Sequence, residues 1–244
     1  MSEISTRISS KLTDLTRELN IVTHNLANTG TAGYKRRSNA FSKALDAQIG
    51  AGDSSKQNSQ TAAKTIFDFS QGNLVETGRA MDFALCGKGF FVIETPQGPL
   101  YTRNGMFRAD QNGRIVDSIG RAVAGDAGPI SIPADVSLEQ VTVSKDGSVS
   151  ANGTQIGKLK LVDFKDNENQ LIAAGTNCFS ASKDIKPLEA ENIEIKQGFR
   201  EGSNVKMVEE LVDMVMITRL YEANMKFVSV NKETSKNLLS VAMG

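Results

Sequence analysis

The sequence predicts an α+β protein, with a long helix at each end of the chain and an all-β module inserted between the helices. The prediction depends on where the residues that break helices occur. All five prolines lie between residues 96 and 187, no glycine precedes Gly30, and no glycine occurs from Ser203 to Met243. Because glycine and proline interrupt helices and form turns, this distribution favours helix at both ends and turns in the middle.

The first predicted element is an amphipathic helix within residues 1–30. Its apolar residues are four or three positions apart, which places them on one face of an α-helix. They are Ile4, Ile8, Leu12, Leu15, Leu19, Val22 and Leu26. This narrow stripe is close to a heptad repeat, so it indicates packing against other long helices. The helix is expected to end at Asn28-Thr29-Gly30, with Gly30 in the left-handed conformation of a C-cap.

Residues 31–65 are predicted to form an extended linker. Their central stretch, residues 50–60, reads GAGDSSKQNSQ and is typical of a flexible connector. A basic cluster, GYKRR, covers residues 33–37. Such charge runs are usually solvated faces, and the alternative is contact with acidic neighbours or lipid head groups.

Residues 66–199 are predicted to form the all-β module, because short β-type runs recur there with turn signals between them. The runs are FDF, LV, MDFALC, GFFVIE, LYTR, MFRA, RIV, VTVS, KLKLVDF and IEIKQG. The turn signals include Asn112-Gly113, Asp146-Gly147 and Asn152-Gly153. The GKG of residues 87–89 lacks the spacing of a phosphate loop, so it is expected to form the turn into the strand FFVIE.

Residues 200–244 are predicted to form the second long helix, capped by Ser203 or Asn204 and with acidic residues in its early turns. The helix carries two apolar stripes on different faces. The first is Val208, Val212, Met216, Leu220, Ala223, Phe227, Val230, Thr234, Leu238 and Val241, and the second is Met214, Ile217, Tyr221, Met225 and Val228. Two stripes need neighbours on two sides, and one partner helix in the same chain covers only one of them. This arrangement suggests a function in assembly.

The composition excludes several classes of function. The 244 residues include 28 Lys+Arg and 28 Asp+Glu, so the basic surface that a general nucleic-acid binder needs is lacking. One His and two Cys are too few for a structural zinc site and for most nucleophilic triads. The acidic segment 163–169 lacks the glycine of an EF-hand loop and is expected to be a solvated hairpin tip. We therefore expect no catalytic residue, no metal and no cofactor.

No targeting or membrane-spanning segment is visible in the sequence. The N-terminus is polar and amphipathic, so no cleaved signal peptide is expected. No apolar run approaches the ~20 residues that span a bilayer, so an integral membrane protein is not expected. Cys86 and Cys178 do not make a disulfide framework; they are interpreted as two small core thiols, and the spacing leaves open whether they meet.

Four motifs occur in the order in which they occur in one protein family. Residues 24–35 resemble NNLANxxTxGYK, and residues 72–74 with 81–92 resemble TGNPLDLAIDGKGFFVV. Residues 101–113 resemble YTRNGSF followed by DANG, and the fourth motif, QGxLExSNVD with its continuation to QRAYEAN, is matched between residues 197 and 224. His24 and Cys86 depart from the usual residues. By these motifs the chain resembles the bacterial flagellar rod and hook proteins.

The resemblance implies a structural subunit of the flagellar basal-body rod, the drive shaft that crosses the periplasm, and no enzymatic activity. Such subunits are exported by the flagellar type III apparatus without a cleaved signal. They assemble helically around the export channel, with paired terminal helices inside and the β-module outside. The implied partners are copies of the chain, other rod proteins, and ring or export-gate components at the rod base. The short length and the segments 127–133 and 157–162 place the chain nearer the proximal-rod branch than the distal-rod branch.

The expected assembly interface takes residues from both helices. From the N-terminal helix they are Ile8, Leu12, Leu15, Leu19, Val22, Asn25, Leu26 and Asn28; from the C-terminal helix they are Val212, Met216, Leu220, Tyr221, Asn224, Phe227 and Val230. For Asn25 and Asn28, a local role in capping and turn formation is the alternative to a subunit contact.

A second hypothesis is an exported enzyme or glycan-binding β-domain with helical anchors. Its support is the β-module and carboxylates of a kind that any protein surface carries. A pair of Asp or Glu side chains in a cleft would distinguish it from a structural subunit.

Overall fold

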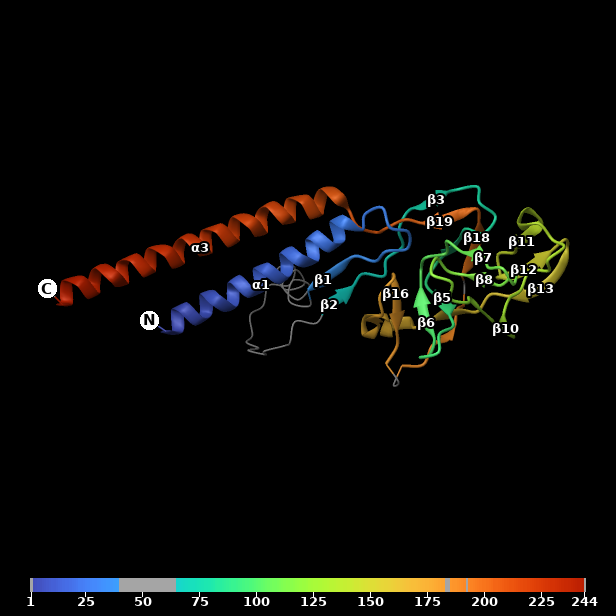
Figure 1. Cartoon of the computed structure of the whole chain (residues 1–244), viewed down its shortest axis with the longest axis horizontal. Helices are drawn as coiled ribbons and strands as arrows, with labels where there is room; N and C mark the ends of the chain where they lie inside the picture. The colour runs from blue at the N-terminus through green and yellow to red at the C-terminus, as the bar shows by residue number, and fades with distance from the viewer. Residues whose placement is uncertain (1, 40–64, 183–184, 192, 244) are drawn as a thin grey trace. The chain divides into compact units, whose positions relative to one another are not determined.

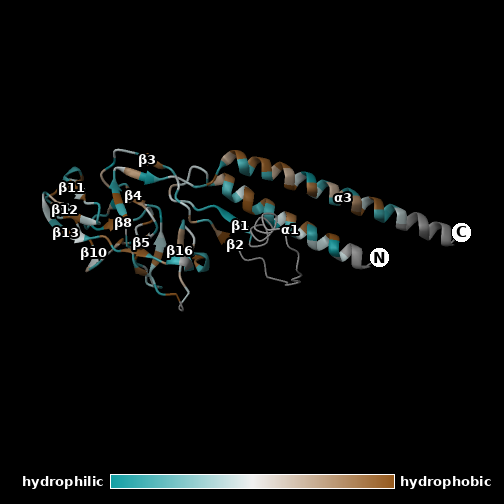
Figure 2. Ribbon diagram, turned by 180° about the vertical axis from the view of Figure 1, so that it is seen from behind, coloured by the Kyte–Doolittle hydropathy of each residue, from teal (hydrophilic) through white to brown (hydrophobic). Residues whose placement is uncertain are grey.

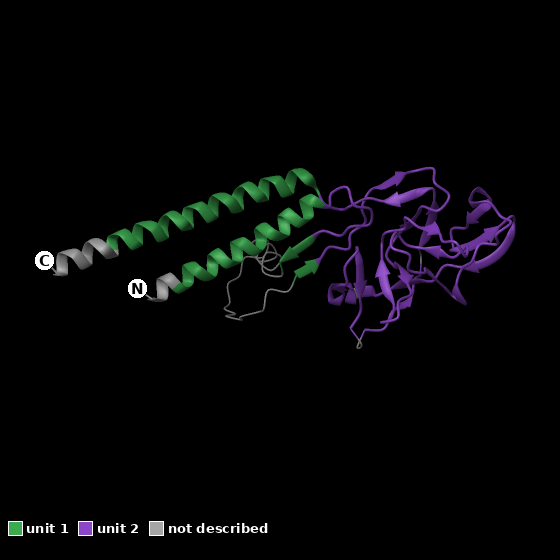
Figure 3. Ribbon diagram, viewed as in Figure 1, with its two compact units in different colours: residues 1–27, 37–66, 206–244 green, residues 28–36, 67–205 purple. Residues whose placement is uncertain are grey.

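The computed structural model describes residues 2–39, 65–182, 185–191 and 193–243 (Figure 1). The chain has a long N-terminal helix, a β-rich middle and a long C-terminal helix, which confirms the predicted α+β class. It divides into two compact units, coloured separately in Figure 3. Unit 1 comprises Met1–Ala27, Arg37–Ile66 and Lys206–Gly244, and unit 2 comprises Asn28–Arg36 and Phe67–Val205. The predicted connector at 50–60 lies outside the described residues.

Unit 1 contains both long helices. Helix α1 spans Ser2–Ala27 and helix α3 spans Met207–Met243. The two helices lie side by side and run in opposite directions (Figures 1 and 2). Apolar side chains of both helices pack into one cluster, whose members are Leu15, Leu19, Val22, Met214 and Ile217. This packing stabilises helices that would be marginal alone in water.

Helix α1 ends where the sequence predicts, but by a different local structure. It stops after Ala27, and in the following turn the Thr31 N–H donates to the carbonyl of Asn28 (3.1 Å). Gly30 does not adopt the left-handed conformation, so the predicted C-cap is wrong. The left-handed glycine of this segment is Gly33, with φ of 64°.

Helix α3 begins later than its predicted caps, so these caps are also wrong. Its first residue is Met207, three positions after Asn204. The Asn204 side chain makes hydrogen bonds inside unit 2 instead. Its Oδ1 accepts the Arg36 N–H (2.7 Å), and its Nδ2 donates to the carbonyls of Asp68 and Ser70 (2.8 and 3.2 Å). Because the amide is occupied in this way, it is not available to cap a helix.

The largest sheet of unit 2 has six antiparallel strands in the order β15-β16-β6-β5-β14-β17. Its strands are β5 (Phe90–Ile93), β6 (Leu100–Thr102), β14 (Leu161–Asp163), β15 (Ile172–Ala173), β16 (Cys178–Ser180) and β17 (Leu188–Glu189).

Smaller sheets complete the β-rich region. A three-stranded sheet holds β11 (Val141–Val143), β12 (Ser148–Ala151) and β13 (Thr154–Lys158). Four strand pairs are β3 (Leu74–Glu76) with β19 (Phe199–Glu201), β4 (Phe83–Cys86) with β18 (Glu194–Gln197), β7 (Arg108–Ala109) with β8 (Ile115–Val116), and β9 (Ala124–Gly125) with β10 (Gly128–Pro129). A further pair is β1 (Arg37–Asn39) with β2 (Thr65–Phe67), and two short 3-10 helices are η1 (Leu138–Gln140) and η2 (Lys165–Gln170).

Strand β5 is apolar at every position, FFVI, and lacks the apolar–polar alternation of a strand with one face in water. Phe90 and Val92 belong to one buried cluster, while Phe91 and Ile93 belong to another. Successive side chains of a strand point to opposite faces, so β5 is covered on both. The first cluster is rich in aromatic edge contacts, among them Phe69 with Phe90 at 5.4 Å between ring centroids. The strand therefore lies at the centre of unit 2.

Two local predictions for unit 2 have different outcomes. Asn152 and Gly153 both have positive φ (50° and 78°) between β12 and β13, which confirms the predicted tight hairpin turn. The acidic segment 163–169 is not a hairpin tip, because η2 occupies most of it. The Asp163 side chain accepts the N–H groups of Phe164 and Lys165 (2.7 and 3.1 Å), and this local bonding starts the short helix.

The two cysteines are free and differ in exposure. Cys178 is buried, whereas Cys86 is only half-buried, so the interpretation as two core thiols is wrong for Cys86. Burial raises the pKa of the Cys178 thiol, although Arg121 Nη2, which donates to its Sγ at 3.1 Å, acts in the opposite direction.

We expect the native protein to expose one thiol to a thiol reagent such as Ellman's reagent near pH 8. We expect Cys86 to react in the native protein and Cys178 to react only after denaturation. Burial of Cys178 slows the access of the reagent to its thiol and disfavours the reactive thiolate. The measurement is the thiol count with and without guanidinium, with a Cys86→Ala variant to assign the fast phase. Equal rates for both thiols in the native protein would contradict the described burial.

Candidate assembly surface and buried ion cluster

Most of the exposed large apolar side chains among the described residues belong to α3. Figure 2 shows the hydrophobic colour recurring along this helix. Six residues of the predicted interface are in this set: Tyr221, and five that are each 51–58% exposed, Val212, Met216, Leu220, Phe227 and Val230. We call these five residues the open face of α3. A long apolar face exposed to water is typical of a surface that binds another protein.

The other predicted apolar interface residues are largely covered within unit 1. On α1, Leu15 and Val22 are buried, and the half-buried residues are Ile8, Leu12, Leu19 and Leu26. On α3, Tyr221 is 37% exposed, and the half-buried Asn224 donates its amide to the carbonyl of Leu220, one turn back. The structure thus divides the predicted interface into a covered α1 stripe and an open face on α3.

The exposed side of α1 is polar. Of its described side chains, in residues 6–27, none that is exposed is a large apolar residue. Several exposed hydroxyls donate to carbonyls of their own helix, those of Ser10, Thr13, Thr16 and Thr23. Partial burial, followed by the charge of Arg37, lowers the pKa of His24. Within unit 1, α3 supplies the apolar surface and α1 does not.

Asn25 and Asn28 make their hydrogen bonds within the chain. Asn25 is fully buried; its Oδ1 accepts the Arg37 N–H (2.8 Å), and its Nδ2 donates to the Arg37 carbonyl (2.9 Å) and to Glu210 Oε2 (3.1 Å). The half-buried Asn28 accepts the Thr31 hydroxyl at 3.1 Å. The Asn28 contact corresponds to the local role in turn formation. Asn25 instead bonds to Arg37 and to the distant Glu210, and it has no exposed surface to offer a second subunit.

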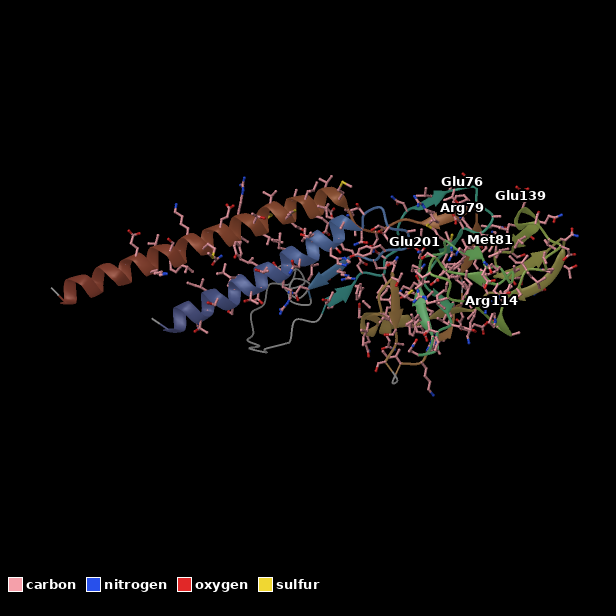
Figure 4. The ribbon with its side chains drawn as sticks, viewed as in Figure 1. Glu76, Arg79, Met81, Arg114, Glu139 and Glu201 are labelled. Carbon is pink, nitrogen blue, oxygen red and sulfur yellow. The ribbon has the colours of Figure 1, made fainter. Side chains whose placement is uncertain are left out.

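A buried ion cluster lies in unit 2, around Glu201, which is labelled in Figure 4. Lys35 Nζ donates to Glu201 Oε1 (2.7 Å) and to the carbonyl of Ser70 (2.6 Å). Arg103 Nη1 lies 3.4 Å from Glu201 Oε2, and its Nη2 donates to the carbonyl of Gly87 (2.7 Å). The side chains of Lys35, Arg103 and Glu201 are at most 1% exposed. One carboxylate therefore compensates two buried cations.

Burial dominates the electrostatics of this cluster. It lowers the pKa of Lys35 and of Arg103, and the neighbouring Glu201 carboxylate opposes both shifts. The Arg103 guanidinium also lies over the Phe90 ring, with Cζ 5.5 Å from the ring centroid. Taking charges out of water costs several kcal/mol for each ion, so the cluster is stable only while its partners remain complete.

The four motifs of the sequence meet around Glu201. The Gly33 N–H donates to the Glu201 carbonyl (2.8 Å), and the Gly72 N–H donates to Glu201 Oε1 (2.9 Å). Lys35 comes from the first motif and Arg103 from the third. The basic run at residues 33–37 does not predict this site. Its interpretation as a solvated face is wrong for Lys35, which is 1% exposed. A signal was present in the glycines beside each ionic residue, which permit close approach of backbones.

Gly33→Ala is expected to lower the free energy of unfolding by at least about 2 kcal/mol, because φ is positive there and a Cβ would lie 2.5 Å from the Arg103 backbone. Gly30→Ala is the matched control; its φ is not positive and no atom lies within 4 Å of the position that a Cβ would take, so a change within about 1 kcal/mol is expected. Urea unfolding of both variants makes the comparison. If both variants lost the same free energy of unfolding, the close approach of the Arg103 backbone would not be what requires glycine at residue 33.

The described part of the chain contains no group of three or more His, Cys, Asp or Glu side chains placed to hold a metal ion. Its helices also include none that is both long and apolar enough to cross a membrane. Two features stand out among the described residues: the exposed apolar face of α3 and the buried cluster that holds backbone segments together.

Comparison with known proteins places these features in a family. Residues 84–151 match the family model of the flagellar hook protein FlgE/F/G D1 domain, and residues 196–241 match that of the flagellar basal body rod FlgEFG protein C-terminal region. The chain is 31% identical to the flagellar basal-body rod protein FlgF of Caulobacter vibrioides, over 93% of each chain. It is 32% identical to FlgG of Agrobacterium fabrum, over 90% of this chain and 93% of the relative.

The flagellar basal-body rod protein FlgF of Salmonella typhimurium is 31% identical, over 91% of this chain and 92% of the relative. Both ends of the chain and the module between them are therefore covered by the likeness. On this evidence the chain belongs to the family of flagellar basal-body rod proteins.

Proposed function

We propose that this chain, a structural subunit of the flagellar basal-body rod and not an enzyme, enters the rod by helical self-assembly through its terminal helices. The observation that carries the proposal is the open face of α3, where five large apolar side chains are each more than half exposed. Burying them against another subunit would stabilise the assembly by about 1 kcal/mol for each side chain, given that about half of the area of each is still exposed.

The proposal assigns different neighbours to the two stripes of α3. The stripe that contains Met214 and Ile217 pairs with α1 in a coiled-coil-like arrangement, supported by their common cluster with Leu15 and Val22. The open face takes a helix of another subunit, a copy of this chain or another rod protein. The β-rich segment, residues 66–199, is then a module inserted between the assembly segments 1–30 and 200–244, with 31–65 as linker.

The wider setting of the proposal follows the family. The chain would form part of the proximal, periplasmic rod, a torque-transmitting drive shaft around the export channel. It would reach this place through the flagellar export apparatus without cleavage of a signal peptide. Ring and export-gate components at the base of the rod would be its further neighbours.

Disulfide trapping in isolated basal bodies tests the proposed contact. In a background of Cys86→Ala and Cys178→Ala, Phe227→Cys places a thiol on the open face, and Ser229→Cys places one on an exposed polar position two residues away. Oxidation of isolated basal bodies is expected to cross-link the Phe227→Cys chain to neighbouring subunits and to leave most of the Ser229→Cys chain uncross-linked. Equal yields, or no cross-link at residue 227, would overturn the proposal.

A further inference from the structure

The apolar residues at the α1–α3 contact do not by themselves select one register. Along α1 they repeat at spacings of four and three, at Ile8, Leu12, Leu15, Leu19, Val22 and Leu26. Along α3 the side that contributes Met214 and Ile217 to the shared cluster continues with Tyr221 and Val228, at spacings of three, four and seven. Such patterns return after seven residues. A slip of one helix by seven residues, about 10 Å, therefore brings equivalent positions together again.

The polar contact between Asn25 and Glu210 does not repeat along the helices, because the positions seven residues away are Glu18 and Ile217. Asn25 Nδ2 donates to Glu210 Oε2 at 3.1 Å, and both residues are fully buried. Asn25 is held in place by two hydrogen bonds to the backbone of Arg37, so its amide has a fixed orientation. Because the helices run in opposite directions, this contact brings Val22 level with Met214, and Leu19 level with Ile217.

A slip in either direction takes the buried Glu210 carboxylate away from the Asn25 amide that donates to it. If α3 moves by seven residues toward the start of α1, Glu210 comes level with Glu18, whose pKa is already raised by burial. If α3 moves the other way, Glu210 passes the end of α1 at Ala27. A buried carboxylate without its hydrogen-bond partner is costly, so both slipped registers are disfavoured.

We propose that the Asn25–Glu210 contact is the specificity determinant that sets the register of α1 against α3. The inference rests on the proposed pairing of the terminal helices and adds what selects one pairing among several. A single register matters for assembly, since every copy in a symmetric structure must present the same surface. With the register set, the open face lies at the same height along α1 in every subunit.

Disulfide trapping with a fixed Ile217→Cys distinguishes the registers, in the full chain with Cys86→Ala and Cys178→Ala. Leu19→Cys reports the native register, and Leu12→Cys reports a slip of seven residues. The parent is expected to form the native cross-link in large excess over the slipped one. We call the fraction of cross-linked protein that carries the Leu12→Cys cross-link the slipped share. Glu210→Met is expected to raise this share by about tenfold, because one charge-assisted hydrogen bond changes an equilibrium by about that factor. The expectation is the same whether the cross-link forms within a chain or between two copies.

Two control variants separate register selection from general weakening. Glu210→Gln keeps an oxygen that accepts from Asn25, so it is expected to keep the register of the parent. Asn224→Leu removes a polar residue whose amide bonds only to its own helix, and it is also expected to leave the register unchanged. A slipped share that Glu210→Met does not raise, or that Asn224→Leu raises equally, would overturn the inference. Absence of the native cross-link in the parent would instead overturn the proposed helix pairing.

Discussion

Leu220→Asp is expected to abolish rod assembly and swimming while unit 2 stays folded. Leu220 lies on the open face of α3 and is 51% exposed in the chain alone, so the substitution does little to the isolated subunit. In the assembled rod the new carboxylate would be buried at a helix interface without a partner. Such a group costs several kcal/mol at each contact, and the cost recurs at each copy along a helical assembly.

The measurement combines a swimming assay, isolation of basal bodies, and amide hydrogen exchange of the purified variant. Ser229→Asp is the matched control, since it adds the same charge to an exposed polar position of the same helix. It is expected to swim and to assemble normally. Normal swimming by Leu220→Asp cells would mean that the open face is not an assembly surface, and loss of protection throughout unit 2 would mean that the substitution acts through folding.

Glu201→Ala is expected to lower the free energy of unfolding of unit 2 by about 3–5 kcal/mol, the range found when one partner of a buried ion pair is removed. Lys35 and Arg103 would remain buried without the carboxylate that pairs with both of them, and the Gly72 N–H would lose its acceptor. A loss of this size is a large share of the stability of an ordinary domain.

Urea unfolding followed by circular dichroism measures the loss, and Glu194→Ala is the matched control. Glu194 pairs with Lys145 at the surface, with both side chains more than half exposed, so about 0–1 kcal/mol is expected. Equal losses for the two variants would contradict the importance assigned to the buried cluster. If the Glu201→Ala protein still folds, the size of its stability loss measures how much the ion cluster, as distinct from the apolar cores, contributes to holding the four motif segments together.

The long helices and the strand-rich middle of this protein can be predicted from local sequence patterns. The three- and four-residue spacings predicted both long helices, and the run GFFVIE predicted a strand, because periodicity and β-type composition are properties of neighbouring residues. The two faces of α3 were also predictable, since a helix with two apolar stripes needs two neighbours.

The positions of the ionic and polar residues of the motifs depend instead on contacts between distant segments. Lys35 reads as part of a solvated basic run, yet it is buried because Glu201, 166 residues later, and Arg103 fold against it. Asn25 reads as a helix-end residue, yet its amide contacts Glu210, 185 residues away. Local sequence patterns carry no information about which distant segments will meet, and for a charged side chain the meeting partner determines whether burial is tolerated.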